Sequence, residues 1–311
     1  MKKLFFLAAA ASVMLAACSS DNEEATVAEK SAIRLSTQSL TGMTRAGQSV
    51  QLTQFAADEN VGIFLAENNA GSPVTTGDNV TTYAQPLTYV ADGAGNLANT
   101  QYWPQDGNGL HIFGVYPLAA ATTAAAYNAT GVTFTVAANQ TSDANYKASD
   151  LMTGKPTANN PVARQSTAVD MTFTHLLTKV DVNLSAGDGF TSTEMDAAVV
   201  SILGTLPATT FSVQSTAVGA ASGTATDIVA GTGTTNSVII VPQTIAANAS
   251  FIKVTVGGGD YIYKLPAATT FAAQTKYVFN ITVNKTGLVL TTTQITAWAD
   301  GGEADGNATL Q

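Results

Sequence analysis

The sequence is divided into short runs in which apolar and polar residues alternate, separated by loops of small polar residues. A period of two places successive side chains on opposite faces of a strand, so each run predicts a half-buried β-strand. The clearest runs are Val61–Leu65, Leu87–Val90, His111–Tyr116, Val132–Val136, Val169–Phe173, Leu176–Leu184, Ala198–Leu203, Phe211–Val213, Ser237–Pro242, Phe251–Val256, Tyr261–Leu265 and Tyr277–Val283. No apolar period of 3.6 residues extends far, so we expect little helix. The runs therefore predict an all-β fold.

The loops between these runs are rich in glycine, asparagine and aspartate, as in 91–96, 105–109 and 257–260. These residue types tolerate positive φ angles and suit tight turns between antiparallel strands. About seven short strands in each half of the chain, at regular spacing, predict two β-sandwich domains. We expect the domains to span residues 46–174 and 175–311.

The charge balance argues against nucleic acid as a partner. Charged residues are 11% of the chain, and the formal net charge is −9. Loss of the first 17 residues removes two lysines and no acidic residue, which changes the net charge to −11. No cluster of lysine and arginine offers a footprint for phosphates. We therefore expect no nucleic-acid partner.

The chain is also poor in residues that carry catalysis. Its two histidines, His111 and His175, both lie inside strand-like runs, where a buried or sheet-surface role is the commoner one. Neither a zinc-ligand spacing nor a nucleophile motif is present. We expect no enzyme activity, no metal and no cofactor. Trp103 and Trp298 could form a platform for sugars, although β-sandwich cores use aromatic residues equally well.

The first residues have the pattern of a secretory signal. Lys2 and Lys3 precede an alanine-rich apolar stretch that ends at Leu15, and this stretch is too short to span a membrane as a helix. Leu15–Cys18 reads Leu-Ala-Ala-Cys, which resembles the bacterial lipobox. The resemblance implies removal of residues 1–17 and lipidation of Cys18. An ordinary signal peptide with an incidental cysteine is the alternative.

Residues 18–45 are predicted to form a tether, a short strand and a protease site. The acidic run Ser19–Glu24 cannot pack and predicts a solvated tether. It also resembles the acidic export signal of surface lipoproteins, and a plain linker is the alternative. Ile33 and Leu35 alternate with polar residues, which predicts a strand over Ile33–Thr37. Arg45 stands among small residues and is an accessible site for a trypsin-type protease.

Several phrases together resemble the fimbrillin family of Bacteroidetes. They are Tyr102–Pro104, Leu110–Pro117, Asp150–Thr153, Met171–Val180, Tyr277–Val283 and Ile295–Trp298. Each phrase is short, but their order and spacing extend the resemblance over nearly the whole chain, the lipobox included. The family is similar to the FimA and Mfa pilins.

The resemblance implies two transthyretin-like, Greek-key β-sandwiches that follow a lipoprotein signal peptide. It implies an outer-membrane lipoprotein, anchored through Cys18, that a protease cuts between Arg45 and Ala46. The cut releases the first strand, with Ile33 and Leu35, and a strand from another subunit fills the groove. The resemblance thus implies a structural subunit of a surface fimbrium that supports adhesion, with other fimbrial subunits as partners.

A sandwich that lacks one strand exposes unpaired backbone groups and an apolar trough, which together are a template for an added strand. The candidate donor lies near 287–298, where Leu288, Leu290, Ile295 and Trp298 are the apolar residues of interest. The alternative is that this segment is simply the last strand of its own domain. Two other functions stay open: an anchored glycan-binding lipoprotein, and a tip or anchor subunit of the pilus.

Overall fold

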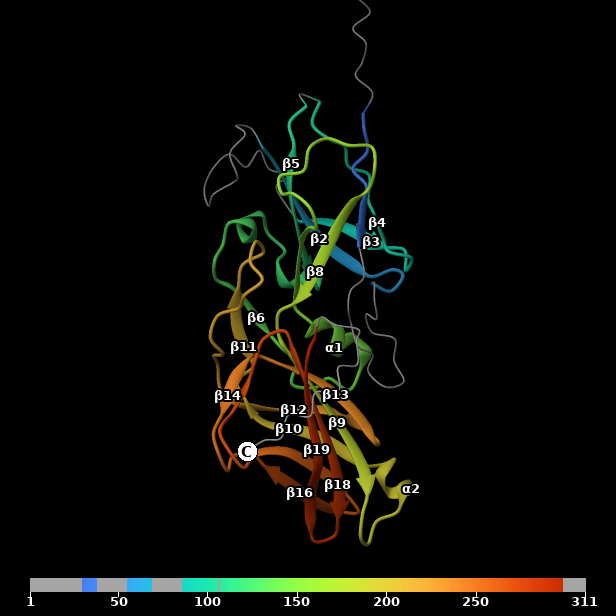
Figure 1. Cartoon of the computed structure of the whole chain (residues 1–311), viewed down its shortest axis with the longest axis vertical. Helices are drawn as coiled ribbons and strands as arrows, with labels where there is room; N and C mark the ends of the chain where they lie inside the picture. Colours follow the sequence, from blue (N-terminus) through green and yellow to red (C-terminus); the bar gives the residue numbers. More distant parts are fainter. Residues whose placement is uncertain (1–29, 38–54, 69–85, 106, 299–311) are drawn as a thin grey trace, which may run out of the picture.

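A computed structural model describes residues 30–37, 55–68, 86–105 and 107–298. The molecule is elongated, with one group of strands at each end of its long axis (Figure 1). Strands from the first half of the chain make up one end, and strands from the second half make up the other. The predicted all-β fold is confirmed.

Seven strands from the first half form one sheet that closes on itself, in the order β1-β4-β3-β2-β5-β7-β8. They are β1 (Leu35–Thr37), β2 (Asn60–Glu67), β3 (Leu87–Ala91), β4 (Asn96–Ala98), β5 (Leu110–Tyr116), β7 (Met152–Pro156) and β8 (Val169–His175). Neighbouring strands are antiparallel except β1 and β8, which are parallel. The barrel is closed by β1, because it pairs with β4 on one side and with β8 on the other.

The second half forms two four-stranded sheets, ordered β12-β10-β15-β16 and β13-β9-β18-β19. Their strands are β9 (Thr178–Ala186), β10 (Val199–Thr205), β12 (Thr226–Thr232), β13 (Thr235–Ile240), β15 (Ser250–Val256), β16 (Gly259–Lys264), β18 (Thr275–Asn284) and β19 (Gly287–Ala297). The inner faces of both sheets contribute to one apolar core, in which the ring centroids of Phe251 and Phe279 lie 5.6 Å apart. This arrangement is a β-sandwich.

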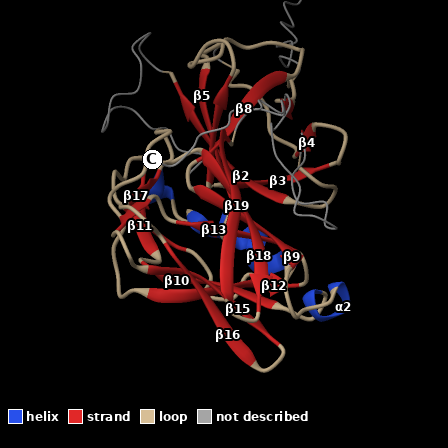
Figure 2. Ribbon diagram, turned by 60° about the horizontal axis from the view of Figure 1, so that its bottom comes forward, coloured by secondary structure: helices blue, strands red, loops and turns tan. Residues whose placement is uncertain are grey.

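Several short elements complete the fold (Figure 2). They are the 3₁₀ helices η1 (Leu118–Ala120) and η2 (Ala124–Tyr127), the helices α1 (Asp143–Ala148) and α2 (Ser192–Met195), and the strands β6 (Val132–Thr135), β11 (Ala208–Phe211), β14 (Gln243–Ile245) and β17 (Thr269–Phe271). β6 belongs to the first half but pairs with β11 of the second. Phe64, Val115 and Phe134 likewise pack into the core of the second half. The halves are therefore connected by backbone pairing and by apolar contact.

Glycine is required where strands of the barrel approach an aromatic ring. Gly114 on β5 and Gly154 on β7 face each other across the sheet, and the ring of Phe173 lies over both. A Cβ atom on either glycine would lie 2.4–2.6 Å from that ring.

The predicted turn at 257–260 joins β15 to β16, and Gly257 and Gly258 both have positive φ there.

The chain passes from the barrel to the sandwich close to the boundary expected from the sequence. β8 ends at His175, the buried residues Leu176 and Leu177 follow, and β9 begins at Thr178. The pairing of β6 with β11 crosses this boundary. The division at 174 and 175, and the transthyretin-like topology of each half, stay predictions.

Candidate functional site

The first candidate site is the position of β1 in the barrel. The register pairs Leu35 with Val169 of β8 and with Leu97 of β4. The amide of Ile33 donates to the carbonyl of Gln101 at 2.8 Å. Further backbone bonds run from Thr37 to Gly95 at 2.7 Å, from Val169 to Arg34 at 2.8 Å and from Trp103 to Ser31 at 2.9 Å. Residues 31–37 are thus bonded on both sides, as an interior strand is.

The side chains of this segment alternate as the sequence predicts. Ile33 and Leu35 are 2% and 1% exposed and belong to the barrel core, and Thr37 is also buried. Arg34 points outward and is exposed. Full burial of an isoleucine or leucine side chain contributes about 1.5–3 kcal/mol. Two such side chains therefore stabilise the closed barrel substantially, although β1 is only three residues long.

Phe55, the first described residue after β1, also belongs to the barrel core. The ring of Phe55 is 1% exposed and packs against the rings of Tyr116 and Phe173, with centroids 5.1 and 5.0 Å apart. Residues 38–54, between β1 and Phe55, include Arg45 and Ala46 and lie outside the described residues. The contacts that hold β1 and those that hold Phe55 thus stand on opposite sides of the predicted cut.

The turn before β4 supports one wall of the β1 position. The carboxylate of Asp92 accepts hydrogen bonds from the amide of Ala94 at 2.7 Å, the amide of Asn96 at 3.0 Å and the side-chain nitrogen of Asn96 at 2.7 Å. These bonds, with the one from the Asn96 side chain foremost, lower the pKa of Asp92 below its ordinary value. The turn fixes Asn96, which pairs with Ser36 of β1.

The second candidate site is β19, at the edge of the sandwich. β19 pairs along its whole length with β18, from Asn284 opposite Gly287 to Thr275 opposite Ala297. Its other edge has no strand paired with it in the described part of the chain. Leu288, Leu290 and Ile295 are half-buried against the sandwich core, whereas Val289 is 54% exposed.

Trp298, directly after β19, is anchored at the junction of the two halves. Its indole is 2% exposed and stacks on the imidazole of His175, with ring centroids 4.2 Å apart. His175 Nδ1 lies 2.7 Å from Asp150 Oδ1, and a carboxylate only accepts, so Nδ1 donates. The Trp298 amide donates to the carbonyl of Gln274 at 2.7 Å. The end of the candidate donor strand is therefore held in its own chain.

The structure also gives the locations of the remaining predicted residues. Both histidines are buried, His111 in β5 and His175 at the end of β8. Trp103 and Trp298 are each 2% exposed, so neither presents a ring face to a sugar. Cys18, like Arg45 and Ala46, lies outside the described residues. No local sequence pattern marks Asp150 and Gln274, which fix the surroundings of Trp298, because their contacts join residues distant in sequence.

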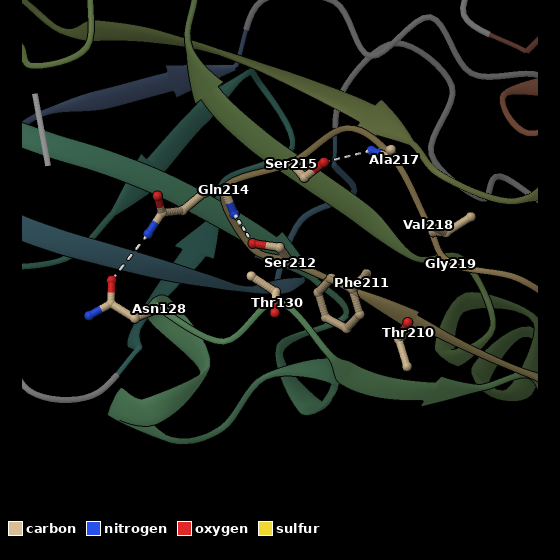
Figure 3. A pocket seen from close by; sticks show the side chains of 10 residues that line it. All are labelled: Asn128, Thr130, Thr210, Phe211, Ser212, Gln214, Ser215, Ala217, Val218 and Gly219. Carbon is tan, nitrogen blue, oxygen red and sulfur yellow. Dashed lines mark hydrogen bonds between the residues drawn. The ribbon is translucent and has the colours of Figure 1, made fainter. Parts of the chain in front are cut away.

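The surface has several hollows. One of about 410 Å³ lies beside β11 and is lined by uncharged polar side chains such as Asn128, Thr130, Thr210 and Gln214 (Figure 3). Gln214 is engaged there, since its side-chain nitrogen donates to the carbonyl of Tyr127 at 2.7 Å. A second hollow, of about 760 Å³, lies between the start of β2, the end of β5 and α1.

The described residues offer neither a metal site nor a membrane-spanning helix. No group of three or more histidine, cysteine, aspartate or glutamate side chains there is placed to hold a metal ion. Within the same residues, no helix has the length and apolar character needed to cross a bilayer.

A barrel joined to a β-sandwich, with a short first strand closing the barrel, defines an all-β protein of two packed parts. The model of the fimbrillin-like family matches residues 44–298, which is most of the chain. The protein therefore belongs to the fimbrillin-like family. No sequence among the curated proteins matches significantly.

Solved structures of Bacteroides proteins share the fold. A proposed cell adhesion protein from Bacteroides uniformis is 23% identical, with a TM-score of 0.61 over 86% of this chain and 98% of that one. A second proposed adhesion protein, from Bacteroides ovatus, is 15% identical, with a TM-score of 0.61 over 87% and 98%. A fimbrial protein from Bacteroides vulgatus is 15% identical, with a TM-score of 0.50 over 86% and 99%.

Membership of this family places the protein among structural fimbrial and adhesion proteins of the cell surface. The family also indicates other fimbrial subunits as its partners. The family is not one of enzymes.

Proposed function

We propose that the protein is a fimbrial subunit that is exported as a lipoprotein on Cys18, cut after Arg45 and assembled by exchange of a strand. The observation that carries the proposal is the position of β1. This strand closes the barrel between β4 and β8, yet it precedes Arg45 in the chain. A cut at Arg45 turns β1 from a part of the fold into a bound peptide.

Loss of that peptide would leave a site suited to another strand. The facing edges of β4 and β8 would lose their partners, and the space that Ile33 and Leu35 fill would open to water. Unpaired edges beside an apolar trough recruit an extended segment, because main-chain bonds supply affinity and alternate side chains supply fit. The emptied barrel is therefore an acceptor for a strand of a second subunit.

The candidate donor has the side-chain pattern that the acceptor requires. Aligned without a gap, Ile33–Thr37 reads Ile-Arg-Leu-Ser-Thr, and Leu288–Thr292 reads Leu-Val-Leu-Thr-Thr. Leu288 and Leu290 then take the two buried apolar positions, and Thr292 takes that of the buried Thr37. Val289, which is exposed in β19, takes the outward position of Arg34. We therefore assign Leu288 and Leu290 as the residues that fill the barrel.

Donation of β19 has a cost that the assembly must offset. The strand would give up its ladder with β18 and the burial of Trp298. The first loss is local to the edge of the sandwich, because β18 keeps its pairing with β9, whereas the second loss falls at the junction of the two halves. If β19 is donated, deletion of residues 288–311 should stop polymerisation. The alternative, in which β19 stays in its own domain and another segment is donated, predicts that polymerisation continues after this deletion.

N-terminal sequencing of assembled fibres from the cell surface tests the cut. The proposal expects a chain that starts at Ala46. Assembled fibres whose subunits still carry a blocked, lipidated Cys18 would contradict it. A tip or anchor subunit would have the same fold. Labelling with an antibody against the protein shows whether it lies along the fibre shaft or only at the fibre ends.

A peptide of residues 287–298 tests the donor. The cleaved protein should bind the labelled peptide only after β1 has been removed, and fluorescence anisotropy measures this binding. A matched peptide with Leu288→Asp and Leu290→Asp should bind at least tenfold more weakly, since each charge would enter an apolar site. Equal binding of both peptides would show that these leucines do not fill the barrel.

A further inference from the structure

A patch on the outer face of β15 and β16 combines one exposed apolar side chain with two lysines. Ile262 on β16 is 46% exposed, and Lys253 of β15 lies directly opposite it in the ladder. Lys264, two residues along the same strand, shares this face and is exposed. Asp260 is exposed on the same face, and its carboxylate lies 4.0 Å from the Lys253 ammonium. Lys264 makes no ion pair within the described chain, so the face keeps one excess positive charge. We call these three residues the Ile262 patch.

The hollow beside α1 has the complementary chemistry. Leu118 and Pro117 contribute apolar surface, and Asp58 and Asp143 add carboxylates. Both aspartates are exposed and make no side-chain hydrogen bond or ion pair with the described residues.

A third carboxylate of the hollow, Glu59, is already neutralised. It pairs with Lys147 and accepts a hydrogen bond from the Tyr116 hydroxyl at 2.9 Å. The hollow therefore keeps two uncompensated negative charges beside an apolar floor. We call it the α1 hollow.

The two surfaces cannot meet within one molecule. β16 lies at the far end of the sandwich in both views (Figures 1 and 2), whereas α1 lies near the middle, where the barrel meets the sandwich (Figure 1). A contact between two different surfaces of identical subunits is heterologous, and such contacts repeat along a chain of subunits unless they close into a ring. The arrangement of charge and apolar surface thus suits a linear polymer.

We propose that the Ile262 patch of one copy docks into the α1 hollow of the next. Ile262 rests on the apolar floor at Leu118, and Lys253 and Lys264 face Asp58 and Asp143. The contact deepens the proposed function, on which it rests for its role in a fibre. Charge pairs at the rim of such an interface mainly guide encounter and set orientation, so the contact aligns a neighbour before its strand is exchanged.

A charge exchange between two variants tests the contact. The first variant carries Asp58→Lys with Asp143→Lys, and the second carries Lys253→Glu with Lys264→Glu. Each variant alone brings like charges together, so sedimentation of the uncleaved protein at low salt should show self-association weakened roughly tenfold or more. In an equal mixture, the basic hollow of one variant meets the acidic patch of the other, and association should return.

Two controls keep the test decisive. A variant with Lys155→Glu and Lys285→Glu makes the same change in net charge as the second variant on other exposed positions, and its association should match that of the parent. Should a reversal variant fail to fold, a trap with Leu118→Cys and Ile262→Cys in a Cys18→Ser background replaces it. Mild oxidation should then link separate copies into a ladder.

The contact is wrong if the unmodified protein does not self-associate, if the mixture fails to recover, or if the trap gives no ladder. These outcomes are separable from failure of strand exchange. A cleaved protein that polymerises although the mixture fails leaves strand exchange intact and removes the docking contact. A mixture that recovers although the cleaved protein does not polymerise has the opposite meaning.

Discussion

The imidazole of His175 lies flat against the indole of Trp298, with ring centroids 4.2 Å apart and an angle of 10° between the planes. His175 ends β8, the strand whose residues Val169–Met171 pair with β1. Trp298 follows β19, the candidate donor. One strand of the barrel therefore contacts both the segment that we expect to leave and the end of the segment that we expect to be donated.

Truncation of Trp298 should loosen β19. Trp298→Ala removes a buried side chain and leaves a cavity beside His175, a change that costs about 3–5 kcal/mol in protein cores. Denaturant unfolding of the uncleaved protein measures the loss. Val289→Ala on the exposed face of β19 is the control and should change stability by less than about 0.5 kcal/mol. Equal effects of the two substitutions would mean that the stack does not anchor the strand.

Truncation of Leu35 should lower the stability of the uncleaved protein but not that of the assembled fibre. Leu35→Ala should destabilise the uncleaved protein by about 2–5 kcal/mol, because the side chain is fully buried in the barrel. The assembled form has lost this residue if the cut occurs at Arg45. Fibres that carry the substitution in their precursor should therefore dissociate in denaturant at the same concentration as the parent fibres. A shift in that concentration would place Leu35 in the mature fibre.

The sequence indicated most of the strands, because half-buried strands leave a clear period of two. It predicted β2, β5, β15 and β18 within a few residues, and it also predicted the short strand around Leu35. β7 was missed because Gly154 and Pro156 disfavour a strand, and the need for glycine becomes visible only when Phe173 lies over it.

Pairings between distant residues were beyond reach. The run at Phe211–Val213 was placed too late: β11 ends at Phe211, and the carbonyl of Ser212 accepts from the amide of Ser215 in a turn. Nothing local indicates that β6 pairs with β11, or that β1 joins β8 in parallel across about 130 residues. The Trp298 environment was likewise hidden, since Asp150, His175 and Gln274 come from three separate segments.

The close approach of Gly154 and Phe173 predicts that a larger residue at position 154 destabilises the fold, and that a smaller one at position 173 recovers part of the loss. Gly154→Ala places a methyl group about 2.6 Å from the ring, and overpacking of this kind costs about 1–3 kcal/mol. Phe173→Leu, itself destabilising, should recover part of that loss when the two changes are combined. A double-mutant cycle by denaturant unfolding measures the coupling. Additive effects would show that the ring does not limit the space at this position.

Asp92 predicts how acid affects the wall beside β1. Its hydrogen bonds from Asn96 and Ala94 lower the pKa of the Asp92 carboxyl in the folded protein below its value in the unfolded chain. A lowered pKa contributes stability that is present above the unfolded value of about 4 and is lost as the pH falls through the folded value. Asp92→Asn should therefore be less stable than the parent at neutral pH, and the difference should shrink below about pH 4.

Unfolding of both proteins from pH 7 to pH 2 measures this convergence. Asp58→Asn is the matched control, because Asp58 is exposed, its carboxylate makes no hydrogen bond among the described residues, and asparagine tolerates its positive φ. Its curve should run parallel to that of the parent over this range. Because Asn96 pairs directly with Ser36, the acid effect should also speed the release of β1 after cleavage. A release rate that does not change between pH 7 and pH 3 would separate the Asp92 turn from the β1 site.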